Sequence, residues 1–269
     1  MKRISGIGKF IIAIAAIMAV MTVLLLFIRT KQEQNSSYIT IDPDSMKLVQ
    51  LEPPKTGDPI AVVNTTIGEF RFVLYPQYSP EAVKNFVDLA NSGYYDNTYV
   101  FNSESGAFSA AGSKNKNGTM PENYDKSKEL IPRELNQDLW PFRGAVCSMN
   151  TTVDRTFKER IFGGGTYFNG SRFLLVDSIE MDEETKNQLL DSSANKELGQ
   201  AFIDNGGIPN FSQQMTVIGQ TYEGLDVIEA LAELETDNNG EYKIPVDDVM
   251  ILSVEISEFS PEDVKNTEK

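Results

Sequence analysis

Residues 68–98 read GEFRFVLYPQYSPEAVKNFVDLANSGYYDNT, and this stretch decides how the folded part of the chain begins. Apolar side chains alternate from Glu69 to Tyr75, which predicts a β-strand with one buried face. Ser79-Pro80-Glu81 then supplies a hydroxyl N-cap, a proline at the first helical position and an acid in the first turn, which together indicate a helix start. Gly93 is a typical C-terminal stop. The stretch therefore predicts a strand followed by a helix over 79–92.

The chain on either side of this stretch is rich in short strands. Ile60–Thr65 precedes it as a β-rich run and is expected to form a hairpin with the strand that follows. A second helix is predicted over Tyr222–Leu234, and residues 180–206 are acidic and helix-prone, which indicates a helical surface insertion. Further apolar runs of strand length lie at 144–149, 173–176 and 250–256. Many short strands with one early and one late helix predict a mainly β fold, a closed barrel with helical caps.

The composition excludes several classes of function. The net charge of the 269 residues is -15, and because residues 1–31 carry five basic side chains and no acid, the remainder holds 19 basic against 39 acidic side chains. A domain this acidic repels phosphate backbones, so no nucleic-acid partner is expected. Histidine is absent, which excludes Ser-His-Asp catalysis and histidine-ligated zinc. We predict no metal and no cofactor, and we interpret the lone Cys147 as a small buried hydrophobe.

The N-terminal part of the chain has the pattern of a membrane segment. Residues 10–28 are apolar except for Thr22, and their 19 residues at about 1.5 Å rise come close to the ~30 Å thickness of a bilayer core. The alternative is a cleaved signal peptide, but its apolar region is usually shorter and ends in small residues. The pattern favours an uncleaved, single-pass transmembrane helix.

The charges that flank this segment predict its orientation. Basic residues precede the apolar run, so residues 1–9 are expected in the cytoplasm and everything after Thr30 outside the cell membrane. The polar stretch 29–58, which contains Pro53-Pro54, is predicted to be an extended extracytoplasmic linker. The folded domain is then expected over 59–259, with a polar tail at 260–269.

Several motifs in the folded part resemble the cyclophilin-type peptidyl-prolyl isomerases, in the same order and at similar spacing. They are Ser79–Phe86, Gly93–Thr98, Arg143–Met149, Asn169–Phe173, Gly206–Pro209 and Gly224–Ile228. The resemblance covers about residues 59–259. It implies a closed eight-stranded antiparallel barrel capped by two α-helices, and an activity that speeds rotation about X-Pro bonds in proline-containing polypeptides.

The resemblance also implies a catalytic groove that departs from the family pattern at its most important position. Cyclophilins use an arginine that donates hydrogen bonds to the twisted proline nitrogen. Asn102 stands at this position here, and shifting the segment by one residue offers Ser103 instead, so the arginine is missing in either register. Arg172 is one cation that could partly replace it, although a charge on the rim of the groove is the alternative reading.

Other groove positions are implied in the same way. They are Phe101, Ala107, Phe108, Ala110, Met149, Asn150, Phe173, Leu174, Asn210 and Met215. Because many of these differ from the family's residues, three functions remain open: an isomerase for exported chains, a peptide- or protein-binding module with weak or lost catalysis, and a structural component of a cell-envelope assembly.

Overall fold

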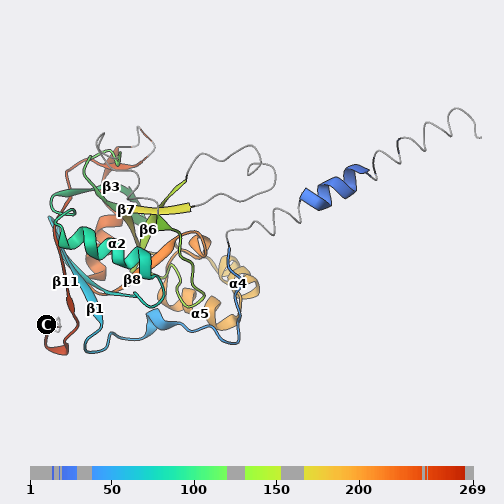
Figure 1. Cartoon of the computed structure of the whole chain (residues 1–269), viewed down its shortest axis with the longest axis horizontal. Coiled ribbons are helices and arrows are strands. Elements are labelled where there is room, and N and C mark those ends of the chain that lie inside the picture. The colour runs from blue at the N-terminus through green and yellow to red at the C-terminus, as the bar shows by residue number, and fades with distance from the viewer. Residues whose placement is uncertain are drawn as a thin grey trace, which may run out of the picture. The chain divides into compact units, whose positions relative to one another are not determined.

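The computed structural model describes residues 14, 18, 20–28, 38–119, 131–152, 167–237, 240 and 242–263 (Figure 1). The chain divides into two compact units, one formed by residues 1–37 with 152–166 and the other by residues 38–151 with 167–269.

In the first unit, the described residues from Ile14 to Ile28 are helical. No helix among the described residues is long and apolar enough to cross a membrane. Residues 10–13, 15–17 and 19 of the predicted anchor lie outside the described residues. The prediction of a transmembrane helix is therefore not supported by the described part of the chain.

The second unit is built around a closed barrel. Its eight strands are β1 (Pro59–Thr65), β2 (Glu69–Leu74), β3 (Thr98–Glu104), β4 (Phe108–Ser113), β6 (Ala145–Thr152), β7 (Tyr167–Val176), β8 (Thr216–Glu223) and β11 (Met250–Glu258). They follow the order β4-β3-β11-β1-β2-β8-β6-β7, and antiparallel pairing of β4 with β7, from Phe108↔Val176 to Ala111↔Phe173, closes the ring. The predicted eight-stranded antiparallel barrel is confirmed.

Three short strands lie outside this ring. Strand β5 (Ile131–Pro132) pairs with β7, and β9 (Thr236–Asp237) pairs with β10 (Ile244–Pro245) in a separate small sheet. The segment that carries β10 lies beside β3, because the Ser103 N–H donates to the Lys243 carbonyl at 3.0 Å.

Two helices pack on the barrel, as the amphipathic patterns predict. Helix α2 (Pro80–Asn91) lies across the strands in Figure 1 and buries Phe86, whose ring contacts those of Phe72 and Phe173. Helix α6 (Leu225–Ala232) buries one apolar face. It begins at Leu225 instead of Tyr222, because Glu223 still belongs to β8 and pairs with Arg71 of β2. The predicted start of this helix was therefore wrong by three residues.

The acidic segment after β7 forms two further helices, α4 (Glu183–Ser192) and α5 (Lys196–Asn205). Asp182 and Asn195 are their N-caps and accept the N–H groups of Thr185 and Leu198 at 2.8 Å. Helix α4 buries no residue, whereas α5 buries Phe202, whose ring lies 4.6 Å from that of Phe142. This helix pair is therefore attached to the domain mainly through α5.

Residues 38–51, which we call the strap, differ from the extended linker that the sequence predicts. Ile41, Met46 and Leu48 pack against the cluster that contains Trp140 and Phe202. The two adjacent prolines further on suggested a spacer, but the apolar residues before them pack on a surface formed by Trp140 and by helix α5, which are distant in the chain. The strap is therefore part of the folded domain.

Gln50 attaches the end of the strap to the rest of the domain. Its replacement tests whether the strap is part of the folded domain. Its side chain is buried, donates to Gln220 Oε1 at 2.8 Å and accepts the Trp140 N–H. We expect Gln50→Leu to lower the free energy of unfolding in urea by about 1–3 kcal/mol, because a buried N–H is left without a partner. Gln77→Leu, at an exposed position, is the matched control. Equal unfolding midpoints for the two variants would show that the strap is not docked.

Candidate functional site

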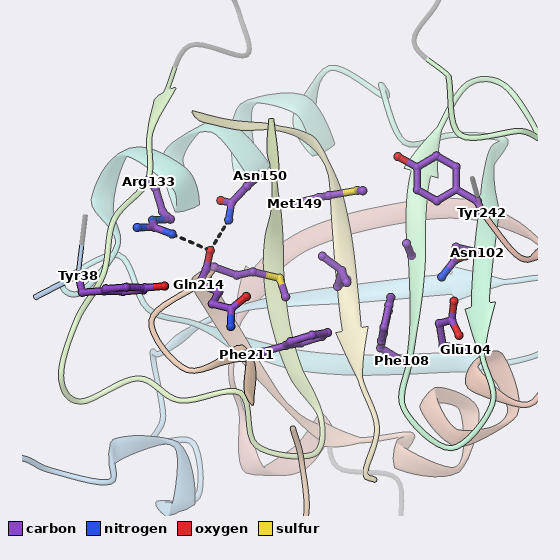
Figure 2. Close-up of a pocket in the computed structure, with 13 residues that line it drawn as sticks. Tyr38, Asn102, Glu104, Phe108, Arg133, Met149, Asn150, Phe211, Gln214 and Tyr242 are labelled. Atoms are coloured by element: carbon purple, nitrogen blue, oxygen red, sulfur yellow. Dashed lines mark hydrogen bonds between the residues drawn. The ribbon is translucent and has the colours of Figure 1, made fainter. Parts of the chain in front are cut away.

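A cavity of about 410 Å³ lies on the barrel and is called the groove here (Figure 2). Strands β3, β4, β6 and β7 form one part of its lining, and the strap, the residues after β5, the loop before β8 and the segment before β10 form the rest. The lining residues are Tyr38, Asn102, Glu104, Phe108, Ala110, Arg133, Met149, Asn150, Leu174, Phe211, Gln214, Met215 and Tyr242.

The floor of the groove is apolar. Ala110 of β4 is paired with Leu174 of β7, so their side chains share one face of the barrel wall. Phe108, two residues before Ala110, faces the same way, and its ring lies 5.4 Å from that of Phe211 at an interplanar angle of 62°. Met215 completes the hollow. These side chains can surround a small apolar group such as a proline ring.

Asn102 is held rigidly in the wall of the groove. Its side chain is 3% exposed, and its Oδ1 accepts the Lys243 N–H at 2.7 Å. That bond turns the amide nitrogen of Asn102 toward the cavity (Figure 2). Ser103, which takes this position if the segment is shifted by one residue, is buried beside Asn102. It is not among the described residues that line the groove. Asn102 therefore presents a neutral N–H donor where the resemblance implies an arginine.

The charge next to Asn102 is compensated. Glu104 lies two residues along β3, lines the groove and forms an ion pair with Lys243 Nζ. Lys243 thus holds the Asn102 amide through its backbone and neutralises Glu104 through its side chain. This end of the groove carries no net charge from the two.

Arg172 lies outside the groove lining that the structure describes. Its Nη1 donates to the Gly118 carbonyl at 2.7 Å and to the Tyr242 hydroxyl at 3.4 Å, and its guanidinium lies 5.7 Å from the centre of the Phe101 ring. Arg172 therefore contacts Tyr242 from outside the groove. The geometry gives no support to Arg172 as a substitute donor in the groove.

Four other predicted groove residues lie elsewhere. Phe101 is fully buried beneath Tyr242, with ring centroids 5.0 Å apart, and Phe173 faces the core because it alternates with Leu174. Ala107 lies in the β3–β4 turn, where its carbonyl accepts the Asp177 N–H at 2.7 Å. Asn210 uses its backbone carbonyl to accept the Gln214 side chain. The family resemblance names positions in a sequence, but the strand period turns Phe101 and Phe173 away from the groove, and Ala107 and Asn210 lie outside the strands.

Six lining residues were not predicted: Tyr38, Glu104, Arg133, Phe211, Gln214 and Tyr242. Arg133 Nη1 donates to the Gln214 carbonyl at 3.0 Å, and Asn150 Nδ2 donates to the same oxygen (Figure 2). Arg133 and Gln214 are 81 residues apart, and no local pattern signals their contact. Phe211 directly follows the predicted Asn210 and Gln214 directly precedes the predicted Met215, so the sequence pointed only to their neighbours.

The family model for "Cyclophilin type peptidyl-prolyl cis-trans isomerase/CLD" matches residues 60–256, which is most of the chain. The chain belongs to the cyclophilin family. Apart from Tyr38, which lies ahead of the matched segment, all residues that line the groove fall within it.

Curated proteins similar to this cyclophilin are named for peptidyl-prolyl cis-trans isomerase activity. A candidate peptidyl-prolyl cis-trans isomerase from Staphylococcus haemolyticus is 30% identical over 197 residues, covering 73% of this chain and 90% of the relative. A candidate bifunctional phosphatase/peptidyl-prolyl cis-trans isomerase from Streptococcus pyogenes is 27% identical over 213 residues, which are 78% of this chain and 41% of that protein.

Solved structures agree on the fold. A crystal structure of a cyclophilin type peptidyl-prolyl cis-trans isomerase from Cryptosporidium parvum superposes with a TM-score of 0.53 and 18% sequence identity, covering 74% of this chain and 98% of the other. At this identity the likeness concerns the barrel alone. The activity of this cyclophilin has to be argued from its own groove.

Proposed function

We propose that this cyclophilin binds proline-containing segments in the groove and isomerises them weakly or not at all. Its apolar floor suits a proline ring, and this favours binding over a purely structural role. The observation that carries the proposal is Asn102, whose amide is held by Lys243 at the position where the resemblance implies the catalytic donor. Family membership suggests isomerase activity, and the groove chemistry argues that this activity is low.

The expected size of the loss follows from the missing charge. Rotation about an X-Pro bond crosses a barrier of about 20 kcal/mol, and the enzyme must stabilise the twisted state more than the planar ones. Removal of one preorganised donor typically costs about 10²–10³ in rate. Asn102 keeps a neutral donor in the groove, so a residual activity is expected.

Two measurements on the full-length chain test the proposal. A labelled proline peptide should bind, and the same peptide with alanine in place of proline should bind more weakly. The catalysed isomerisation rate should be at least about 10² below that of a cyclophilin with the groove arginine. A rate equal to such an enzyme would contradict the proposed loss, and equal binding of both peptides would contradict the proposed ligand.

We further propose that the protein acts on exported polypeptides and is anchored by residues 10–28, with its N-terminus in the cytoplasm. The length of the apolar run and the basic residues before it support this arrangement. Mass spectrometry of a membrane fraction should then find the intact N-terminus. Recovery of a soluble form that starts near residue 30 would contradict the anchor.

A further inference from the structure

The loop from Phe211 to Met215 forms a large part of the groove wall. Phe211, Gln214 and Met215 all line the cavity. Gln213, in the middle of this loop, adopts a φ of +60°, an uncommon conformation for a residue other than glycine. Such a conformation persists only where the surrounding contacts hold it. The shape of this wall therefore depends on what holds Gln213.

The strap holds Gln213. The Ile39 N–H donates to Gln213 Oε1 at 2.9 Å, across 174 residues of sequence. Tyr38, the neighbour of Ile39, lines the groove, whereas Gln213 is not among the described lining residues. One hydrogen bond outside the cavity therefore positions two pieces of its wall, the loop and Tyr38.

A second set of bonds attaches the strap to the segment after β5. Gln137 Oε1 accepts the Asp42 N–H at 2.9 Å, and Gln137 Nε2 donates to Ser45 Oγ at 3.1 Å. The segment after β5 is in turn bonded to the loop through Arg133 and the carbonyl of Gln214 (Figure 2). The strap, this segment and the loop are thus bonded to one another at one end of the groove.

We infer that the strap is a clamp for the groove, with Gln213 as its positioning residue. The inference rests on the proposed binding of proline segments and names how that binding is controlled. The groove binds a peptide tightly when residues 38–47 are docked, and it loses affinity when they are released. The strap lies ahead of residues 60–256, so the clamp is not part of the segment that the family model matches.

The direction of the effect follows from the conformations that the loop gains without the strap. Once released, Gln213 is free to leave its uncommon φ, and Phe211 and Met215 on either side move with the backbone. The apparent affinity of the groove then falls in proportion to the fraction of molecules in which the wall is formed. The loss of one net hydrogen bond typically shifts such an equilibrium by about twofold to tenfold.

Fluorescence anisotropy with the full-length chain and a short, uncharged, labelled peptide with one proline tests the clamp. Gln213→Met keeps the length of the side chain and removes the acceptor, so we expect about twofold to tenfold weaker binding. Gln213→Glu keeps an acceptor oxygen for the Ile39 N–H and should bind the peptide as the unaltered protein does.

Gln137→Met releases the second attachment of the strap and should also weaken binding. The double variant Gln213→Met/Gln137→Met should lose more affinity than the product of the two single effects, because each attachment keeps the strap close to the partner of the other. Gln77→Met, at an exposed position outside the strap and the described groove lining, makes the same chemical change and should leave the affinity as it is.

Val254→Ala is the control for general destabilisation. Val254 is a buried residue of β11 that packs in the core of the barrel and is not among the described lining residues. Its replacement should lower the free energy of unfolding in urea and leave the affinity for the peptide unchanged. Gln213→Met should show the reverse, with weaker binding and an unfolding midpoint close to that of the unaltered protein.

Hydrogen exchange followed by mass spectrometry measures the coupling in the other direction. Coupling between two sites is reciprocal, so a bound peptide must also favour the docked strap. A saturating proline peptide should therefore slow the exchange of the amides in residues 39–47 of the unaltered protein. In the double variant, where the strap is no longer bonded to either segment, the same peptide should protect these amides less.

Equal affinities of Gln213→Met, Gln213→Glu and the unaltered protein would overturn the clamp while leaving the proposed function intact. Exchange in residues 39–47 that does not change on peptide binding would overturn it as well, and so would an equal loss of affinity in Val254→Ala. If no proline peptide binds, the proposed function fails and the clamp fails with it.

Discussion

Replacing Asn102 by arginine, Ala110 by glutamine and Leu174 by phenylalanine together should raise the isomerisation rate by at least about 10²-fold. The arginine restores a charged donor at the wall of the groove. The other two changes fill a floor in which Ala110 and Leu174 face each other across β4 and β7. Ala107, another groove position that the resemblance implies, is left unchanged because it lies in the β3–β4 turn outside the described lining.

Asn102→Arg alone should restore little. The new side chain loses the bond to the Lys243 N–H, and Glu104 on the same face of β3 can draw its guanidinium away from the proline. An empty floor would also leave the proline loose, and a misplacement of about 1 Å can cost ~10² in rate. The three changes should therefore exceed the product of the single effects.

The triple variant with lysine in place of arginine at position 102 is the matched control, because it has the same charge but lacks the planar fork of donors. Its rate should stay well below that of the arginine form. Rates are measured by a coupled or exchange assay on one proline peptide. If the arginine form gains no more than the lysine form, the missing donor is not what limits this cyclophilin.

Phe173→Ala should lower the free energy of unfolding by about 3–5 kcal/mol, the cost of removing a large aromatic ring from a packed core. Phe173 is 1% exposed, and its ring lies 5.7 Å from that of Phe86 and 5.5 Å from that of Tyr95. These contacts join β7 to α2 and to the turn after it. Urea unfolding measures the effect.

The adjacent Leu174 provides the comparison. Leu174→Met conserves volume and should cost less than about 1.5 kcal/mol, yet it changes the floor of the groove and so the affinity for a proline peptide. The opposite pattern, with normal stability but weakened peptide binding in Phe173→Ala, would indicate that Phe173 lines the groove and not the core.

The sequence alone determined the barrel, because the barrel is built from local patterns. Strand alternation in β2, the N-cap and proline that start α2, and short apolar runs at regular intervals each report which face of an element is buried. Together with the order of the cyclophilin motifs, these local patterns predict the topology of the barrel. The sequence also predicts that the catalytic arginine is missing, because Asn102 and Ser103 both lack its charge whichever register is chosen.

Only the tertiary structure decided what covers and completes the groove. Phe173 and Leu174 are neighbours in the sequence, but the strand period sends one to the core and the other to the cavity. The strap was expected to be a spacer, since its apolar residues show no strand or helix period and their partners lie around Trp140 and Phe202. Tyr38, Arg133 and Gln214 meet because hydrogen bonds fasten separate loops together. Such contacts depend on the three-dimensional arrangement of distant segments, so periodicity along the chain does not predict them.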